Sequence, residues 1–99
     1  MIIYIDIDDT ICRHKIPDNY ESAYPIEKAV AKVNELYHAG NHIVMWTARG
    51  TVTGLDFEEL TWNQLNSWGV MFSELKMGKP AYDLFIDDKN LNSKDWLDE

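Results

Sequence analysis

The chain contains one cysteine, Cys12, among its 99 residues. A single cysteine excludes an internal disulfide and a metal cluster built from several thiolates. Long apolar runs are also missing, since the run from Ile2 to Ile5 is far shorter than the roughly 20 apolar residues of a membrane-spanning helix. No basic segment or small-residue cleavage site accompanies this run, so the sequence shows no export signal. We therefore expect a cytoplasmic protein without a membrane partner.

Positive charge is scarce as well. The chain has 9 Lys and Arg residues against 17 Asp and Glu residues, which gives a net charge of -8. The basic residues are scattered, whereas binding to a nucleic-acid backbone requires clustered cations. We therefore expect no nucleic-acid partner. A small phosphorylated substrate stays compatible with this composition, because a bound divalent cation reverses the local charge.

The length fits a single domain, residues 1–99, and leaves no room for a large cap or substrate domain. Hydrophobic residues make up 45% of the chain and charged residues 26%, which is typical of a globular protein rather than a disordered one.

Apolar runs alternate with helical patterns in the first half of the chain. The run Ile2–Ile7 is interrupted only by Asp6 and predicts a strand buried on both faces, as in a parallel sheet. Residues 11–24 have no clear period and predict a loop or a small hairpin. Apolar residues then recur at helical spacing from Pro25, in the first turn, to Gly40. The run His42–Trp46 predicts the second strand.

The second half continues the alternation. Asp56 and Glu59 have capping-box-like spacing at the start of a helix that Gly69 ends. A short third strand is predicted at residues 70–73 and a fourth at residues 82–86. A last short helix follows, capped by Asn92 or Ser93 and containing Trp96 and Leu97.

This order of strands and helices predicts a parallel α/β sheet. The link at residues 74–81 is too short for a helical crossover. Fully extended it spans roughly 27 Å, so we expect it to return along the sheet as a strap.

Polar residues fall at the carboxyl ends of three predicted strands. Asp6 and Asp8 belong to the first, Thr47 follows the second, and Asp87 with Asp88 follows the fourth. Ligands of open α/β sheets bind at that edge. Four carboxylates gathered there repel one another unless a cation lies between them. The pattern therefore predicts a site for Mg²⁺, which prefers oxygen ligands.

These residues resemble the motifs of the haloacid dehalogenase (HAD) superfamily. Asp6-Ile7-Asp8-Asp9-Thr10 is similar to its first motif, Thr47 to its second, Lys79 to its third and Asp87-Asp88 to its fourth. The four motifs occur in the family's order and span residues 1–90. The resemblance implies a minimal Rossmann-like, HAD-like three-layer sandwich with about four strands. A loop at residues 11–24 and the core helix within residues 50–74 fill the intervals where family members carry a cap, so it implies the capless subclass.

The same resemblance implies the roles of the site residues. Asp6 is the nucleophile that forms an aspartyl phosphate, and Asp8 is the general acid and base. Asp6 and the backbone carbonyl of Asp8 also bind the Mg²⁺. Thr47 hydrogen-bonds a phosphoryl oxygen, and Lys79 neutralises charge on the transferring group, with Lys76 as the competing lysine. An aspartate at position 8 indicates hydrolysis or transfer of a phosphoester.

The resemblance also bears on the remaining ligands. Asp88 is the better metal ligand of its pair. Asp87 either binds the metal directly or supports the direct ligands from behind. Ala48 and Arg49 follow Thr47 in the second motif and are expected substrate contacts, with a surface ion pair as the alternative to phosphate or substrate binding for Arg49. Arg13 lies on the loop that overhangs the site and is a further substrate contact.

Short HAD-like proteins of capsule or surface-polysaccharide synthesis are similar through four segments: 46–50, 68–70, 78–80 and 86–89. This likeness implies a small phosphorylated metabolite, a sugar or polyol phosphate, as substrate. Nucleotide phosphates are an alternative. Two other classes stay open: a non-catalytic scaffold, and a phosphoacceptor regulatory module, which the order of the motifs disfavours. An open site is also compatible with a homo-oligomer.

Overall fold

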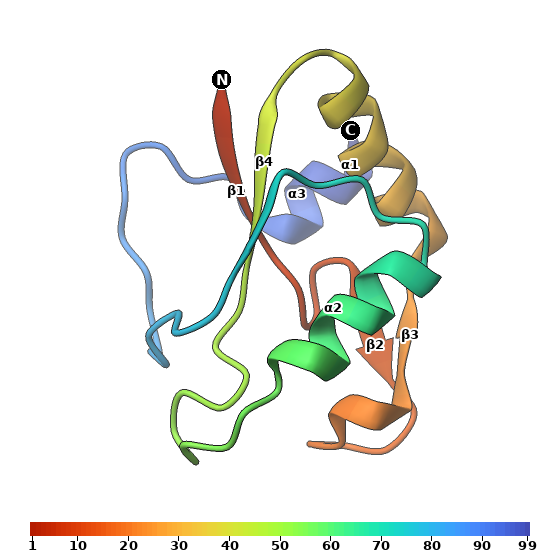
Figure 1. The fold of residues 1–99 in the computed structure, drawn as a ribbon. Helices are drawn as coiled ribbons and strands as arrows, with labels where there is room; N and C mark the ends of the chain where they lie inside the picture. The colour runs from red at the N-terminus through yellow and green to blue at the C-terminus, as the bar shows by residue number, and fades with distance from the viewer.

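The computed structural model describes residues 1–99 and has a three-stranded parallel sheet at its centre. The strand order is β1 (Ile2–Asp6), β4 (His42–Trp46) and β5 (Glu74–Lys76) (Figure 1). In the register, Ile3 pairs with Ile43 and Ile5 pairs with Met45. The short strands β2 (Cys12–His14) and β3 (Ala23–Pro25) form a separate antiparallel hairpin. The parallel α/β class and the small hairpin are therefore as the sequence predicts.

Three helices follow the strands: α1 (Glu27–His38), α2 (Glu58–Ser67) and α3 (Ser93–Asp98). A single 3₁₀ turn, η1 (Tyr20–Ser22), lies between the hairpin strands. The predicted cap of α3 is confirmed, because the Asn92 side chain accepts a hydrogen bond from the backbone N–H of Lys94. None of the helices combines the length and the apolar composition that a membrane crossing requires.

The hydrophobic core lies on one face of the sheet. Side chains alternate between faces along a strand, so Ile5 and Met45 point to the same side, where Val33 of α1 and Leu65 of α2 cover them. Trp96 of α3 packs against the same cluster. Each fully buried aliphatic side chain of this kind contributes about 1.5–3 kcal/mol relative to exposure.

The opposite face of the sheet has no helix on it. Tyr4 is 49% exposed and Ile2 is 71% exposed, and Figure 1 shows all three helices to the right of β1 and β4. The expected three-layer sandwich is therefore wrong, since the helices form one layer. Most of the irregular segment before α3 runs to the left of β1 in Figure 1, on the side away from the helices.

The predicted fourth strand at residues 82–86 is also wrong. This segment has no strand structure, and Leu84 and Ile86 are 75% and 87% exposed. The Lys79 N–H donates to the Thr47 carbonyl at 2.9 Å, which holds the link at the carboxyl end of β4. Tyr82 follows three residues later, so the chain is at the wrong end of the sheet to begin a strand parallel to β1. The third strand also forms later than predicted, at Glu74–Lys76.

Gly50 lies in the turn after β4 and has a φ of 82°. A Cβ atom there would collide with the Leu55 carbonyl oxygen. Gly54 in the same loop has a φ of 75° and open space around the added carbon, so it is a matched control. Both Ala substitutions have a left-handed backbone penalty of about 1–2 kcal/mol. We expect Gly50→Ala to lower the free energy of unfolding, measured in urea, by a further ~1–3 kcal/mol. Equal losses in the two variants contradict the collision.

Candidate active site

A cleft of about 680 Å³ opens at the carboxyl edge of the sheet. This volume is within the range of about 300–1,000 Å³ found for small-molecule sites. Its walls come from the turn after β1, the β2–β3 hairpin, the loop after β4 and the link after β5. The lining residues are Asp6, Asp8, Asp9, Arg13, His14, Pro17, Asp18, Tyr20, Tyr24, Ala48, Arg49, Lys79, Pro80, Ala81 and Tyr82. The cleft thus contains most of the residues that the sequence singles out.

Asp6 ends β1 and faces Lys79 across the cleft. Lys79 Nζ lies 3.2 Å from Asp6 Oδ1, and the Thr10 hydroxyl donates to Asp6 Oδ2 at 3.2 Å. The Asp6 side chain is 34% exposed, so it is both oriented and accessible. Lys76 instead lies over the rings of Tyr4 and Trp46. The structure therefore brings Lys79, and not Lys76, to Asp6.

The ammonium group of Lys79 is held in its charged form. Burial by itself lowers the pKa of Lys79, but a hydrogen bond with Tyr82 and the negative charge of Asp6 together raise the pKa above its ordinary value. The Lys79 side chain is only 14% exposed. A positive charge is therefore fixed beside Asp6 throughout the neutral pH range.

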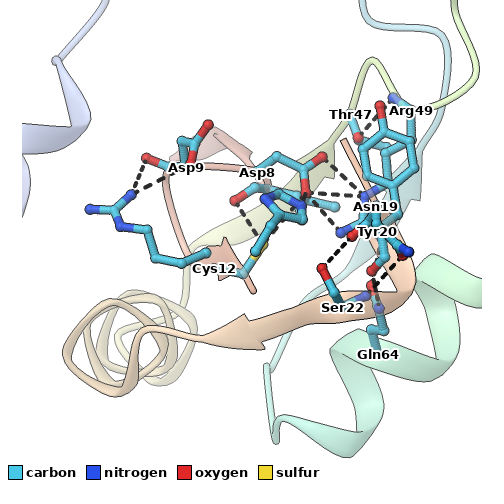
Figure 2. Close-up of polar contacts among 12 residues, drawn as sticks. Asp8, Asp9, Cys12, Asn19, Tyr20, Ser22, Thr47, Arg49 and Gln64 are labelled. Carbon is cyan, nitrogen blue, oxygen red and sulfur yellow. Dashed lines mark hydrogen bonds and ion pairs between the residues drawn. The ribbon is translucent and has the colours of Figure 1, made fainter. Parts of the chain in front are cut away.

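Asp8 is bound on its inner side by the buried Arg49 (Figure 2). Arg49 Nη2 donates to Asp8 Oδ1 at 2.8 Å and Nε donates to Oδ2 at 3.0 Å, which forms a bidentate pair. Arg49 Nη1 donates to Thr61 Oγ1 and to Gln64 Oε1 on α2. The ring of Tyr20 lies against the guanidinium, 4.8 Å away.

The side chain of Arg49 is fully buried. Its donors go to Asp8, Thr61 and Gln64, so the structure shows it as an internal clamp between the turn after β1 and α2. Of the two interpretations of Arg49, the ion pair is the one present, and it is buried rather than on the surface.

The other predicted substrate and phosphate contacts have different environments. Thr47 is 1% exposed and does not line the cleft, and its Oγ1 accepts from the Arg49 N–H at 3.1 Å. Ala48 lines the cleft. Arg13 lines it with a half-exposed side chain and donates to the Asp9 carbonyl at 3.2 Å. Ala48 and Arg13 are therefore accessible to a ligand, and Thr47 is covered.

Asp87 and Asp88 are exposed and do not line the cleft. Asp87 Oδ1 accepts from the Lys89 N–H at 2.8 Å, as in an ordinary Asx turn. These two residues were expected at the cleft because a fourth strand would end there. Since that strand does not form, the structure does not bring them to Asp6 and Asp8.

Sequence reasoning missed the contribution of Cys12, Tyr20 and Gln64. Cys12 Sγ lies 3.5 Å from Asp8 Oδ1, and burial together with the charge of Asp8 raises the pKa of the Cys12 thiol to about 12. Burial and then the charge of Asp8 also raise the pKa of Tyr20. The Gln64 amide donates to the Tyr20 carbonyl at 2.7 Å, which joins α2 to η1. Only the tertiary fold places these residues around Asp8.

No protein-family model matches the chain, and no curated protein sequence matches it. A crystal structure of an MCSG target from Vibrio cholerae is similar, with a TM-score of 0.88 and 21% sequence identity. The similarity covers 99% of this chain and 88% of the Vibrio cholerae chain. At this level of identity the match shows a shared fold.

The buried pair predicts unequal effects of removing two arginines. Arg49→Met leaves the Asp8 carboxylate without its main partner, so we expect the free energy of unfolding to fall by about 3 kcal/mol. Arg13→Met removes an ion pair whose side chains are 47% and 79% exposed, and we expect a change within about 0.5 kcal/mol. Urea unfolding of both variants measures the difference. A loss for Arg49→Met as small as the one expected for Arg13→Met would contradict a stabilising Arg49–Asp8 pair.

Proposed function

We propose that this chain is a Mg²⁺-dependent phosphohydrolase of the HAD type that uses Asp6 as a covalent nucleophile. The observation that supports it is the position of Asp6 at the carboxyl end of β1, open to the cleft, with Lys79 Nζ 3.2 Å away. The Asp6 carboxylate is only 34% exposed, and removing a carboxylate from water is costly unless a charge compensates it. A nucleophile for phosphorus needs this combination of access, orientation and charge compensation.

In the first step, an oxygen of Asp6 attacks the phosphorus of a bound phosphoester. The bond to the leaving alcohol breaks and an aspartyl phosphate forms on Asp6. Negative charge on the phosphoryl oxygens is stabilised by the ammonium of Lys79, which is already in place before the reaction. Thr10, which donates to Asp6 Oδ2, keeps the other carboxylate oxygen in position.

Asp8 carries the protons in both steps. Its side chain is 23% exposed and lines the cleft two residues after the nucleophile. In the first step, protonated Asp8 gives its proton to the departing alcohol oxygen. In the second step, Asp8 takes a proton from the water that attacks the aspartyl phosphate, and phosphate and free Asp6 are regenerated. Arg49, held by α2, fixes the orientation of Asp8 during both steps.

The donor set around Asp6 fits Mg²⁺. This ion takes oxygen ligands, and it commonly uses one or two carboxylates together with water and substrate phosphate. The Asp6 carboxylate is open to the cleft, and the backbone carbonyl of Asp8 belongs to the same turn. These two groups would hold the ion, without the Asp87 and Asp88 ligands that the family resemblance implies. When bound, Mg²⁺ supplies positive charge that neutralises the phosphoryl group facing Asp6.

A sugar or polyol phosphate of surface-polysaccharide synthesis is the proposed substrate class. The cleft has the rings of Tyr20, Tyr24 and Tyr82 in its walls, together with exposed polar groups such as Arg13. Tyrosine offers an apolar ring face and a hydroxyl, which suits a ligand that is apolar on one side and polar on the other. Nucleotide phosphates have the same two properties and belong in the same substrate panel.

A second candidate function is a non-catalytic scaffold that retains the phosphate site. The observation that favours it is the exposure of Asp87 and Asp88 outside the cleft, which leaves few ligands for the metal.

The test is an assay for phosphate release from a panel of substrates. The panel begins with an aryl phosphate and continues with sugar, polyol and nucleotide phosphates. We expect turnover with Mg²⁺, loss of turnover after chelation, and recovery when Mg²⁺ is restored. Asp6→Asn removes the nucleophile and should lower kcat by at least about 10³-fold. Asp98→Asn changes an exposed carboxylate on α3 and is the matched control, with unchanged kcat.

Full activity of Asp6→Asn contradicts the covalent mechanism. A folded protein that turns over no member of the panel supports the scaffold instead.

A further inference from the structure

Cys12 and His14 form a cluster with Asp8, and the proposed reaction uses only Asp8 of the three. One ligand atom from each residue lies within 4.8 Å of the other two. The residues supply a sulfur, a nitrogen and an oxygen, respectively. Cys12 and His14 are two residues apart on β2, so both side chains lie on the same face of the strand, next to the turn that carries Asp8.

The distances within the cluster suit a tetrahedral metal site. Cys12 Sγ and Asp8 Oδ1 are 3.5 Å apart, and His14 Nε2 and Asp8 Oδ1 are 2.9 Å apart. Bonds of about 2.0–2.3 Å to a tetrahedral Zn²⁺ separate neighbouring ligand atoms by about 3.3–3.7 Å. The Cys12–Asp8 separation falls in this range, the His14–Asp8 separation lies just below it, and all three atoms are within 4.8 Å of one another, so modest side-chain adjustments would bring them to a common centre.

His14 Nε2 is buried and forms no hydrogen bond. Its contact with Asp8 Oδ1 has the length of a hydrogen bond but not the direction, so the ring nitrogen does not use the carboxylate as a partner. A buried polar atom without a partner is costly. A metal ion bound between Asp8, Cys12 and His14 would supply the partner that His14 Nε2 lacks.

We propose that Asp8, Cys12 and His14 bind a thiophilic divalent transition metal of the Zn²⁺ type, with a further coordination position open to the cleft. Thiolate and imidazole ligands select such a metal over Mg²⁺. Asp8 and His14 line the cleft, whereas Cys12 lies fully buried behind them. This site differs from the proposed Mg²⁺ site, which uses only oxygen ligands.

The surrounding residues support the ligand positions. Arg49 donates to both oxygens of Asp8 and is itself fixed by α2, so the carboxylate is oriented before a metal binds. Oδ1 accepts from Arg49 Nη2 at 2.8 Å and at a longer 3.3 Å from Nε, which lies closer to Oδ2, so one lone pair of Oδ1 is left for the metal. As the bond from Cys12 Sγ to the metal forms, the thiol proton leaves to solvent and the two charges of the metal replace it.

Cobalt(II) is a suitable probe, because a thiolate bound to Co²⁺ gives a charge-transfer band in the near ultraviolet. Cys12 is the sole cysteine of the chain, so the band reports on this residue alone. We expect the reduced full-length protein to bind one equivalent of Co²⁺ with this band. Zn²⁺ should remove the band by displacing Co²⁺, and excess Mg²⁺ should not. Absence of the band in the folded protein overturns the proposal.

Three variants define the ligands. Cys12→Ser should abolish the band. His14→Gln should weaken Zn²⁺ binding by at least about 100-fold, measured by competition with a chromophoric chelator, because losing a direct ligand costs at least as much as losing a residue that supports one. His42→Gln is the matched control, because His42 Nε2 also lies beside a carboxylate, 2.8 Å from Glu74 Oε2, but outside the cluster. Circular dichroism checks that each variant is folded. If Cys12→Ser does not fold, the partly exposed His14→Gln decides.

Unchanged Zn²⁺ affinity in folded His14→Gln overturns the three-ligand site. The band is measured without substrate, and Asp6→Asn should retain it. Metal binding at this cluster is therefore tested separately from the proposed hydrolysis. If both proposals hold, Zn²⁺ occupies the carboxylate that donates the proton, and the metal inhibits turnover.

Discussion

Arg49 and Asp8 are opposite charges that meet inside the molecule, and each needs the other because water does not reach the guanidinium. A buried arginine is tolerated when its donors are satisfied, and here Asp8, Thr61 and Gln64 accept them. These residues come from the turn after β1, the turn after β4 and α2. The pair thus joins two turns that line the cleft and anchors them to α2 behind the cleft wall, and it fixes the direction in which Asp8 presents its oxygens.

The local sequence pattern was sufficient to predict the elements that depend only on their own side chains. The run His42–Trp46 is the strand that its apolar side chains predict, and Asn92 caps α3 as expected. The segment 82–86 has a similar apolar pattern, but strand formation also requires that the chain arrive at the correct end of the sheet. That requirement depends on the Lys79–Thr47 backbone bond, which no local pattern reveals.

The candidate site was likewise predictable only in part. Asp6 and Asp8 were predicted from their positions at the end of a strand and Lys79 from the family resemblance, and all three line the cleft. The burial of Arg49 was not predictable, because it depends on Gln64 and Thr61, which approach only when α2 packs on the sheet. Cys12 and His14 share a face only once β2 is known to be a strand. Asp8 therefore has a more crowded environment than its motif suggests.

Lys79 is held in position by its main chain as well as by its charge. Its N–H donates to the Thr47 carbonyl, and its own carbonyl accepts from the Thr51 hydroxyl at 2.8 Å. The path of the link therefore does not depend on which side chain stands at this position. For Lys79, the backbone N–H and carbonyl fix the path of the chain, whereas the side-chain ammonium carries the charge. For Arg49 both tasks belong to the same guanidinium, so chemistry can be altered independently of shape at position 79 but not at position 49.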